Sequence, residues 1–323
     1  MTEQELVEAT AALERQSGDR NAVDAYLGRL RSARARTVQL GALEQVAATL
    51  LGQAAVHGIA RGFPWWQLRR EHVAKLRADL LERYAPATVR RMLSAIRGVL
   101  EEAWAAGLMA HDDYAQAVRV KPVRSERLPR GRALEAGELR GLFESCARSG
   151  VIGARDAALL AVCYGAGLRR AEAVGLELAD FDGATGTLTV RHGKGDKARQ
   201  VYATNGGKRA LLAWLEVRGT EPGPFLLAVA KGGRVVGRGL TPAAVAKALS
   251  RLARRAGVAR FSPHDLRRSF VSDLLDAGAD LAVVSKLAGH AQLETTSIYD
   301  RRPEAAKRKA AELLHVPYIP TTA

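Results

Sequence analysis

Apolar side chains recur with the period of an α-helix in the first third of the chain. Helical spacing joins Val73, Leu76, Leu80 and Tyr84, and again, after Pro86, it joins Val89, Leu93, Ile96, Leu100 and Ala103. The pattern predicts two amphipathic helices, each with one face turned to a core. The second helix is expected to end at Gly107, because glycine accepts the left-handed turn that follows many helices.

The hydrophobic pattern changes in the second part of the chain. Residues 187–190 and 200–203 are short and rich in β-branched and apolar side chains, and a glycine-rich turn, 193–196, lies between them. They predict a β-hairpin. Helical patterns return at 242–256, 263–277 and 303–314. In the first two, Thr241 or Ser262 precedes a proline, which supplies an N-cap and a first helical residue.

A basic segment separates these two patterns. Residues 119–132 read RVKPVRSERLPRGR and hold six basic side chains, one acidic side chain, two prolines and a glycine. Such a composition is typical of an extended linker. We therefore expect a helical domain over 1–118, a basic linker over 119–132 and a second domain over 133–323. The predicted fold is mainly α with a small β-sheet.

The charge of the chain indicates its partner. Lys and Arg number 49 and Asp and Glu 34, a formal net charge of +15, in a chain of globular composition with 47% hydrophobic residues. This balance predicts a large anion, and nucleic acid in particular. The longest apolar run, 157–168, is too short to cross a bilayer, so no membrane partner is expected. The two cysteines, Cys146 and Cys163, cannot build a disulfide framework and fit a reducing, cytoplasmic setting.

Two helices carry basic stripes opposite their apolar faces. Arg90 and Arg97 flank Ser94 on the helix that follows Pro86, and Lys247, Arg251 and Arg254 share a face of the helix 242–256. Either stripe can lie along a phosphate backbone, and either can be an ordinary solvated face. We retain all five basic residues as candidate DNA contacts.

Four separated segments of the second domain carry isolated polar groups. They read GAGLRRAEAVGL (165–176), RHGKGDKARQV (191–201), SPHDLRRSF (262–270) and LAGHAQLETTSIYD (287–300). In this order they resemble the tyrosine recombinase, or phage integrase, family. The segment GFPWWQLRREHVAKL (62–76) is similar to the family's DNA core-binding module. The resemblance implies a helical, SAM-like core-binding domain, then an α+β catalytic domain that ends in an exchange helix, 303–314.

The resemblance assigns two arginines to one phosphate. Arg169 and Arg267 are expected to clamp the scissile phosphate, since each planar guanidinium can bridge two oxygens. Glu172 is expected to orient Arg169, and His264 to accept a proton or a hydrogen bond near the phosphate. The residues alone also allow a surface Arg–Glu pair and a capped helix with incidental polar groups.

The remaining catalytic roles also come from the resemblance. Lys194, in the glycine-rich turn, is expected to protonate the leaving 5′ oxygen, with Lys197 as a nearby rival. His290 is expected to donate to a non-bridging oxygen, and Tyr299, nine residues later, to be the nucleophile. Two positions depart from the family pattern, because Arg268 stands where His is common and Ala288 where Leu is common.

The resemblance implies strand exchange in DNA through a 3′-phosphotyrosyl intermediate. No metal and no nucleotide cofactor is expected, because the covalent link keeps the phosphodiester energy. The expected partners are double-stranded DNA with inverted half-sites and three further recombinase subunits, identical or paired, in a tetramer that passes through a Holliday junction. A Xer-like or integrase role on bacterial-type nucleoid or plasmid DNA fits this organisation. The alternatives are a type IB topoisomerase-like enzyme and a catalytically inactive DNA-binding regulator.

Overall fold

The computed structural model describes residues 21–121, 123, 131–191, 198–290, 293–297 and 299. The chain folds into two compact units, 1–128 and 129–323, and each is described by itself. The predicted linker, 119–132, spans the boundary between them. Most of that linker, the hairpin turn with Lys194 and Lys197, and the predicted helix 303–314 lie outside the described residues.

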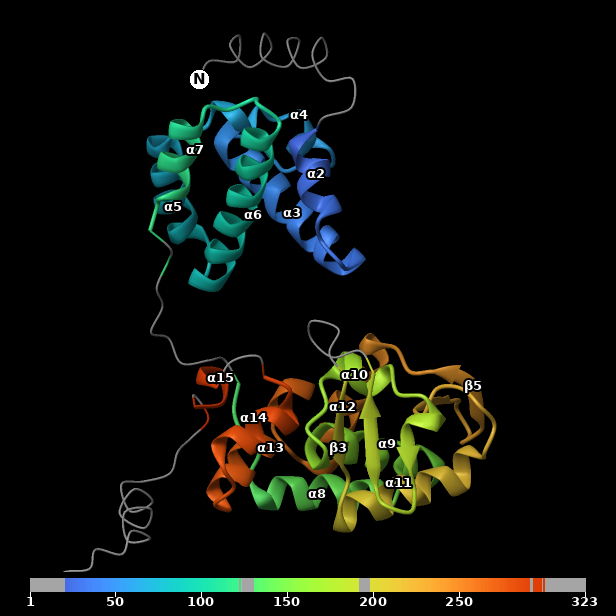
Figure 1. Ribbon diagram of the computed structural model, residues 1–323. Coiled ribbons are helices and arrows are strands. Elements are labelled where there is room, and N and C mark those ends of the chain that lie inside the picture. Colours follow the sequence, from blue (N-terminus) through green and yellow to red (C-terminus); the bar gives the residue numbers. More distant parts are fainter. Residues whose placement is uncertain are drawn as a thin grey trace, which may run out of the picture. The chain divides into compact units, whose positions relative to one another are not determined.

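The first unit is helical throughout its described part (Figure 1). Its elements are α2 (Ala22–Gly28), α3 (Ala33–Leu51), α4 (Ile59–Gly62), the 3₁₀-helix η1 (Trp65–Gln67), α5 (Arg70–Arg83), α6 (Pro86–Ala105) and α7 (His111–Val118). Both predicted helices are confirmed as α5 and α6, and Gly107 has the expected positive φ of 77°. The apolar positions that defined α6 are all buried, so helical periodicity found the core of this unit.

The second unit combines helices with short strands. Its helical elements are α8 (Ala136–Ala147), α9 (Gly150–Leu160), the π-helix η2 (Ala161–Gly165), α10 (Arg170–Val174), the 3₁₀-helix η3 (Leu178–Asp180), α11 (Asn205–Arg218), α12 (Pro242–Ala256), α13 (Pro263–Asp276), α14 (Leu281–Ala288) and α15 (Glu294–Ser297). Its strands are β1 (Phe181–Asp182), β2 (Thr187–Val190), β3 (Arg199–Tyr202), β4 (Leu227–Val229) and β5 (Val235–Gly239). The mainly helical fold with small sheets is confirmed.

Two antiparallel sheets form in this unit. One has the order β1-β2-β3, and the other pairs β4 with β5. The predicted hairpin is confirmed as β2–β3, although β3 begins at Arg199, one residue earlier than expected, because Arg199 pairs with Val190. The β4–β5 hairpin was not predicted; its strands are short and β5 contains glycine, which weakens the sequence pattern.

The helix starts follow the capping residues read from the sequence. Thr241 Oγ1 accepts a hydrogen bond from the Ala244 backbone N–H at 3.1 Å, at the start of α12. Ser262 Oγ does the same for the Asp265 N–H at 3.3 Å, at the start of α13. Each bond satisfies a backbone donor that has no partner within its helix.

The core of the second unit fills the space among α8, α9, α11, α12 and the first sheet (Figure 1). Trp214 is fully buried there, and its indole N–H donates to the Phe225 carbonyl at 2.8 Å. A smaller apolar cluster joins α13 to α14. Within the described ranges, no helix is long and apolar enough to cross a membrane.

The close approach of α8 and α9 yields a stability prediction. A Cβ built at Gly153 would lie 1.9 Å from the Cys146 carbonyl oxygen, whereas one built at Gly137 meets nothing within 4 Å. We predict that Gly153→Ala lowers the free energy of unfolding by about 1–3 kcal/mol through overpacking. Gly137→Ala should leave it unchanged or raise it by up to about 1 kcal/mol. Denaturant titration compares the two, and equal effects would contradict the close packing at Gly153.

Candidate active site

Three guanidinium groups converge on the carbonyl end of α14. Arg169 Nη2 donates to the Gly289 carbonyl at 2.6 Å, Arg199 Nε to the Leu287 carbonyl at 3.2 Å, and Arg267 Nη2 to the Ala288 carbonyl. The last carbonyls of a helix have no partner within it, and the negative end of the helix dipole favours cations. The end of α14 therefore gathers arginines from three distant parts of the chain.

Glu172 lies between two of these arginines. Its side chain is only 3% exposed, and Arg169 Nη1 donates to Oε1 at 2.7 Å. Arg199 approaches from β3 and donates to both carboxylate oxygens, at 3.0 and 2.8 Å. Burial alone would raise the pKa of Glu172, but the hydrogen bonds and charges of Arg199 and Arg169 lower this pKa to about 2. The carboxylate is thus firmly ionised.

Arg169 is held by its backbone as well as by its side chain. It is the N-cap residue of α10, and its own N–H donates to Glu172 Oε2 at 2.8 Å. The Arg–Glu pair is therefore part of a capping box and not an exposed helical pair. The Arg169 side chain is 27% exposed, which leaves its guanidinium partly open to solvent.

Arg267 is the most deeply buried of the three arginines, at 3% exposure. It donates to the carbonyls of Gly167 and Ala288. Gly167 has a φ of +65°, and a Cβ there would lie 2.4 Å from the Phe270 ring, so only glycine can present this carbonyl. Burial and the charge of Arg169 lower the pKa of Arg267 to about 9. An anion beside it would relieve this electrostatic cost.

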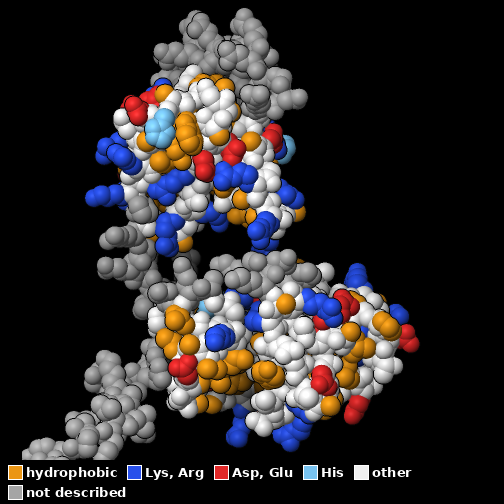
Figure 2. All heavy atoms as spheres, in the orientation of Figure 1, with side chains coloured by type: hydrophobic (Ala, Val, Ile, Leu, Met, Phe, Trp, Pro, Cys, Tyr) orange, Lys and Arg blue, Asp and Glu red, His pale blue; other side chains and the backbone are white. Residues whose placement is uncertain are grey.

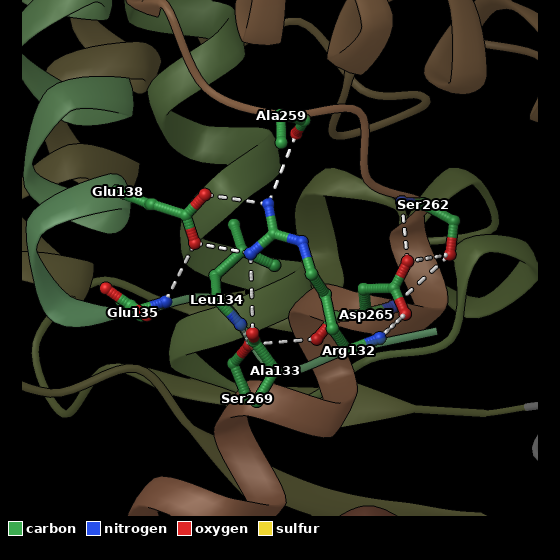
Figure 3. Close-up of polar contacts among 9 residues, drawn as sticks. All are labelled: Arg132, Ala133, Leu134, Glu135, Glu138, Ala259, Ser262, Asp265 and Ser269. Atoms are coloured by element: carbon green, nitrogen blue, oxygen red, sulfur yellow. Dashed lines mark hydrogen bonds and ion pairs between the residues drawn. The ribbon is translucent and has the colours of Figure 1, made fainter. Parts of the chain in front are cut away.

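The start of α13 is anchored to residues 132–134, at the end of the predicted linker (Figure 3). Asp265 Oδ2 accepts from the Ser262 N–H and hydroxyl, at 2.9 and 2.8 Å, while Oδ1 accepts from the Arg132 N–H at 3.1 Å. Ser269 Oγ accepts from the Leu134 N–H at 2.7 Å. These bonds hold the first two turns of α13, which carry Arg267, against the beginning of the second unit.

His264 projects from the first turn of α13 and is exposed. Partial desolvation and the nearby guanidinium groups of Arg268 and Arg267 lower its pKa below the usual value. An imidazole that is neutral at pH 7 can accept a proton or a hydrogen bond.

His290 follows the glycine that ends α14. Its Nδ1 lies 2.8 Å from the hydroxyl oxygen of Thr296, a fully buried residue of α15. Desolvation, followed by the charges of Arg267 and Arg169, lowers the pKa of His290 to about 4. The imidazole is therefore neutral at pH 7, and one ring nitrogen carries a proton.

Tyr299 lies beside this histidine. The two ring centroids are 6.4 Å apart, and the Tyr299 N–H donates to the Thr296 carbonyl at 3.0 Å. Tyr299 is half-buried against the apolar cluster of α13 and α14. The Arg268 guanidinium carbon lies 5.4 Å from the centre of its ring, within reach of a cation–π contact.

The structure gathers most of the site residues that the sequence suggested. Arg169, Glu172, His264, Arg267, His290 and Tyr299 all lie around the end of α14 and the start of α13. Lys194 is outside the described residues, so its place is not shown. Two residues of the site, Arg199 and Thr296, were not predicted from the sequence, although both lie inside the motifs 191–201 and 287–300. Their position in the sequence near Lys194 and Tyr299 was the only signal for a role in the site.

The five candidate DNA contacts fall into two groups. Arg90, Lys247 and Arg254 are exposed. Arg97 donates to the Val120 carbonyl at 2.8 Å, and Arg251 donates to the buried Asp156 carboxylate at 3.2 Å. Both of these side chains therefore also have a structural contact within their own unit.

The site has a surplus of positive charge. Glu172 forms hydrogen bonds with Arg169 and Arg199, and its charge also acts on Arg267. The low pKa values of His290 and Glu172 leave the histidine neutral and the glutamate charged. Guanidinium donors around a half-buried tyrosine suit a phosphate diester, whose charge grows on the oxygens during displacement.

Comparison with known proteins identifies the chain's family. The phage integrase family model matches residues 132–305. Tyrosine recombinase XerC of Azotobacter vinelandii is 37% identical over 73% of this chain and 76% of that protein. XerC of Pseudomonas aeruginosa is 34% identical over 89% of this chain and 96% of that protein. The chain therefore belongs to the phage integrase family of site-specific tyrosine recombinases.

Solved structures share the fold. The Tn1549 transposon integrase, in complex with transposon right end DNA, matches with a TM-score of 0.65 and 15% identity over 96% of this chain and 99% of that one. The XerH site-specific recombinase, bound to palindromic difH substrate, matches with a TM-score of 0.63 and 20% identity over 97% of this chain and 89% of that one. These similarities support the two-domain recombinase fold.

The lowered pKa of His290 predicts a pH dependence of stability. Its folded value of about 4 lies below the ordinary value of about 6.5 in an unfolded chain. Between these values the unfolded chain binds more protons, so the free energy of unfolding should fall as pH falls from about 7 towards about 4. Denaturant titrations at about pH 7 and about pH 5 should show a smaller fall in His290→Asn. An identical fall in variant and wild type would contradict the burial of a neutral imidazole.

Proposed function

We propose that Tyr299 is the nucleophile that cleaves DNA during site-specific recombination. Its hydroxyl oxygen attacks a backbone phosphorus, the bond to the 5′ oxygen breaks, and a 3′-phosphotyrosyl link forms. The 5′ hydroxyl of a partner strand then attacks this link and releases Tyr299. Because the covalent link conserves the phosphodiester energy, the cycle requires no nucleotide cofactor.

The observation that carries this proposal is the convergence of Arg169 and Arg267 on the end of α14, where His290 and Tyr299 follow. Both guanidinium groups can donate to non-bridging oxygens and balance the charge of the pentacoordinate state. Glu172 orients Arg169 without touching the phosphate. His264, exposed at the first turn of α13, is the proton acceptor or hydrogen-bond partner beside it.

The contact with Thr296 suits His290 as a neutral donor. When the Thr296 hydroxyl donates to Nδ1 across their 2.8 Å separation, the ring proton resides on Nε2. Nε2–H can then donate to a phosphate oxygen although the low pKa keeps the ring uncharged. Thr296 is therefore proposed to select the tautomer of His290.

Lys194 is proposed as the general acid for the leaving 5′ oxygen. An alkoxide leaves poorly, and a positioned proton donor typically accelerates such a step by about 10²- to 10⁴-fold. In the sequence, Lys194 lies between Val190 and Arg199, which pair in the described strands β2 and β3. Arg199 in turn contacts Glu172, so the hairpin starts beside the phosphate site.

The proposed substrate is double-stranded DNA with inverted half-sites, bound by the basic surfaces of both units. Blue Lys and Arg side chains are spread over the drawn face of the first unit in Figure 2. The exposed Arg90, Lys247 and Arg254 are proposed phosphate contacts, with Arg97 and Arg251 as further candidates. Such contacts make affinity strongly dependent on salt.

The proposed working assembly is a tetramer on DNA, of this chain alone or with a paired recombinase. The segment 303–314 is proposed to dock on a neighbouring subunit and to couple the sites through a Holliday junction. The proposed setting is bacterial nucleoid or plasmid DNA, since the named relatives are bacterial proteins. The relatives are named tyrosine recombinases, which favours recombination over topoisomerase-like relaxation and over an inactive regulator.

A nicked suicide substrate tests the nucleophile. On such DNA the 5′ fragment diffuses away after cleavage, so the covalent intermediate accumulates. We predict a protein–DNA adduct, visible as a band of lower mobility in a denaturing gel, that Tyr299→Phe abolishes. The control is Tyr202→Phe, because Tyr202 is an exposed tyrosine of β3, and this variant should form the adduct at the wild-type rate. Persistence of the adduct in Tyr299→Phe would exclude Tyr299 as the nucleophile.

A further inference from the structure

Arg199 makes a connection within the site that no other described residue makes. Its side chain is 13% exposed and donates to both oxygens of Glu172, at 3.0 and 2.8 Å, and to the Leu287 carbonyl at 3.2 Å. A Cβ at Gly289, the residue before His290, would lie 2.9 Å from its guanidinium carbon. Arg199 thus joins the β2–β3 hairpin, Glu172 and the end of α14.

We propose that Arg199 is a positioning residue for DNA cleavage, which keeps Arg169 available to the phosphate and holds the end of α14 in register with the hairpin. The proposal rests on the function proposed above. Arg199 does not need to touch DNA for this role, since its three hydrogen bonds all go to groups that place Arg169 or His290.

The positioning role depends on which arginine donors each carboxylate oxygen of Glu172 accepts. Arg199 occupies both, so the side chain of Arg169 meets only Oε1, through Nη1, and its Nη2 meets the Gly289 carbonyl. A guanidinium has five N–H donors, and three remain on Arg169 for other acceptors. Without Arg199 the buried carboxylate would draw Arg169 into a bidentate pair and away from the phosphate.

A lysine cannot replace this arginine. A planar guanidinium can meet two carboxylate oxygens and one carbonyl in a fixed geometry, whereas an ammonium is a point charge on a flexible stem. We therefore expect both Arg199→Lys and Arg199→Met to slow cleavage by about 10- to 100-fold, the usual effect of a small displacement of a catalytic group. DNA affinity should change by less than about threefold, because Arg199 is not a proposed phosphate contact.

The test measures single-turnover cleavage of the nicked substrate by Arg199→Lys and Arg199→Met, and compares a normal scissile phosphate with a methylphosphonate. The methylphosphonate lacks the charge that the arginine clamp balances. The matched control is Arg191→Lys, since Arg191 ends the same hairpin at β2, is 59% exposed and pairs with Asp180 away from the site. This control should cleave both substrates at wild-type rates.

If Arg199 acts through Arg169, its defect should shrink at least about tenfold on the methylphosphonate, and the defect of Arg169→Lys should shrink in the same way. An equal defect of the Arg199 variants on both substrates would show that Arg199 only supports the fold. A wild-type cleavage rate of these variants on the normal phosphate would show that Arg199 has no role in cleavage. Either result overturns the proposal. Failure of wild type to form a Tyr299-dependent adduct would instead overturn the proposed function.

A double-mutant cycle keeps the test decisive if Arg199→Met does not fold. Arg199→Lys is combined with Glu172→Gln, and cleavage rates are compared after circular dichroism shows a native spectrum. Since both changes act on the same contact, the double variant should be slower than Glu172→Gln by less than about threefold. Fully multiplicative defects would mean that Arg199 acts independently of Glu172, which contradicts the proposal.

Discussion

The carbonyl groups at the end of α14 need donors that the helix itself cannot provide, and three arginines supply them. Leu287, Ala288 and Gly289 each accept a bond from a different guanidinium. Such a concentration of positive charge would be unstable without an anion. Glu172 is that anion. Its hydrogen bonds and ion pairs with Arg199 and Arg169 outweigh the effect of burial and keep it ionised, with a pKa of about 2. The rest of the site is arranged around this shared interaction.

This arrangement explains how a phosphate site is built from segments far apart in the sequence. Arg169 caps α10, Arg199 begins β3 and Arg267 lies in α13, yet their donors meet within one helical turn. One carboxylate leaves the three cations with a positive surplus. The low pKa of Arg267, about 9, reflects its burial first and then the charge of Arg169. A DNA phosphate would offset the positive surplus, so substrate binding and site electrostatics favour each other. His290 and Tyr299 enter the site because they follow the same end of α14.

Much of this organisation could be predicted from the sequence, and the reasons for the gaps are physical. Periodicity located α5, α6 and α12, each of which buries one face, and the capping residues Thr241 and Ser262 marked the starts of α12 and α13. The motifs supplied the residues that the structure gathers around α14. The role of Arg199 could not be predicted, because its contact with Glu172 depends on the register of β3 and joins residues that are 27 apart in the sequence. The contact of Thr296 could not be predicted either, because its hydroxyl reaches His290 only after α15 has folded. Lys194 stays a prediction, since it lies outside the described residues.

The Glu172 carboxylate is the group that holds the arginine site together. The most direct measurement is the stability of the second unit in Glu172→Gln, followed by hydrogen exchange of the backbone amides of α10 and α14 under increasing denaturant. Removing the charge from a buried, doubly paired carboxylate typically costs about 3–5 kcal/mol, because the arginines lose their counter-charge. We expect a loss in this range, with faster exchange in both α10 and α14. A loss below about 1 kcal/mol, with both helices protected as in the wild type, would contradict this central role of Glu172.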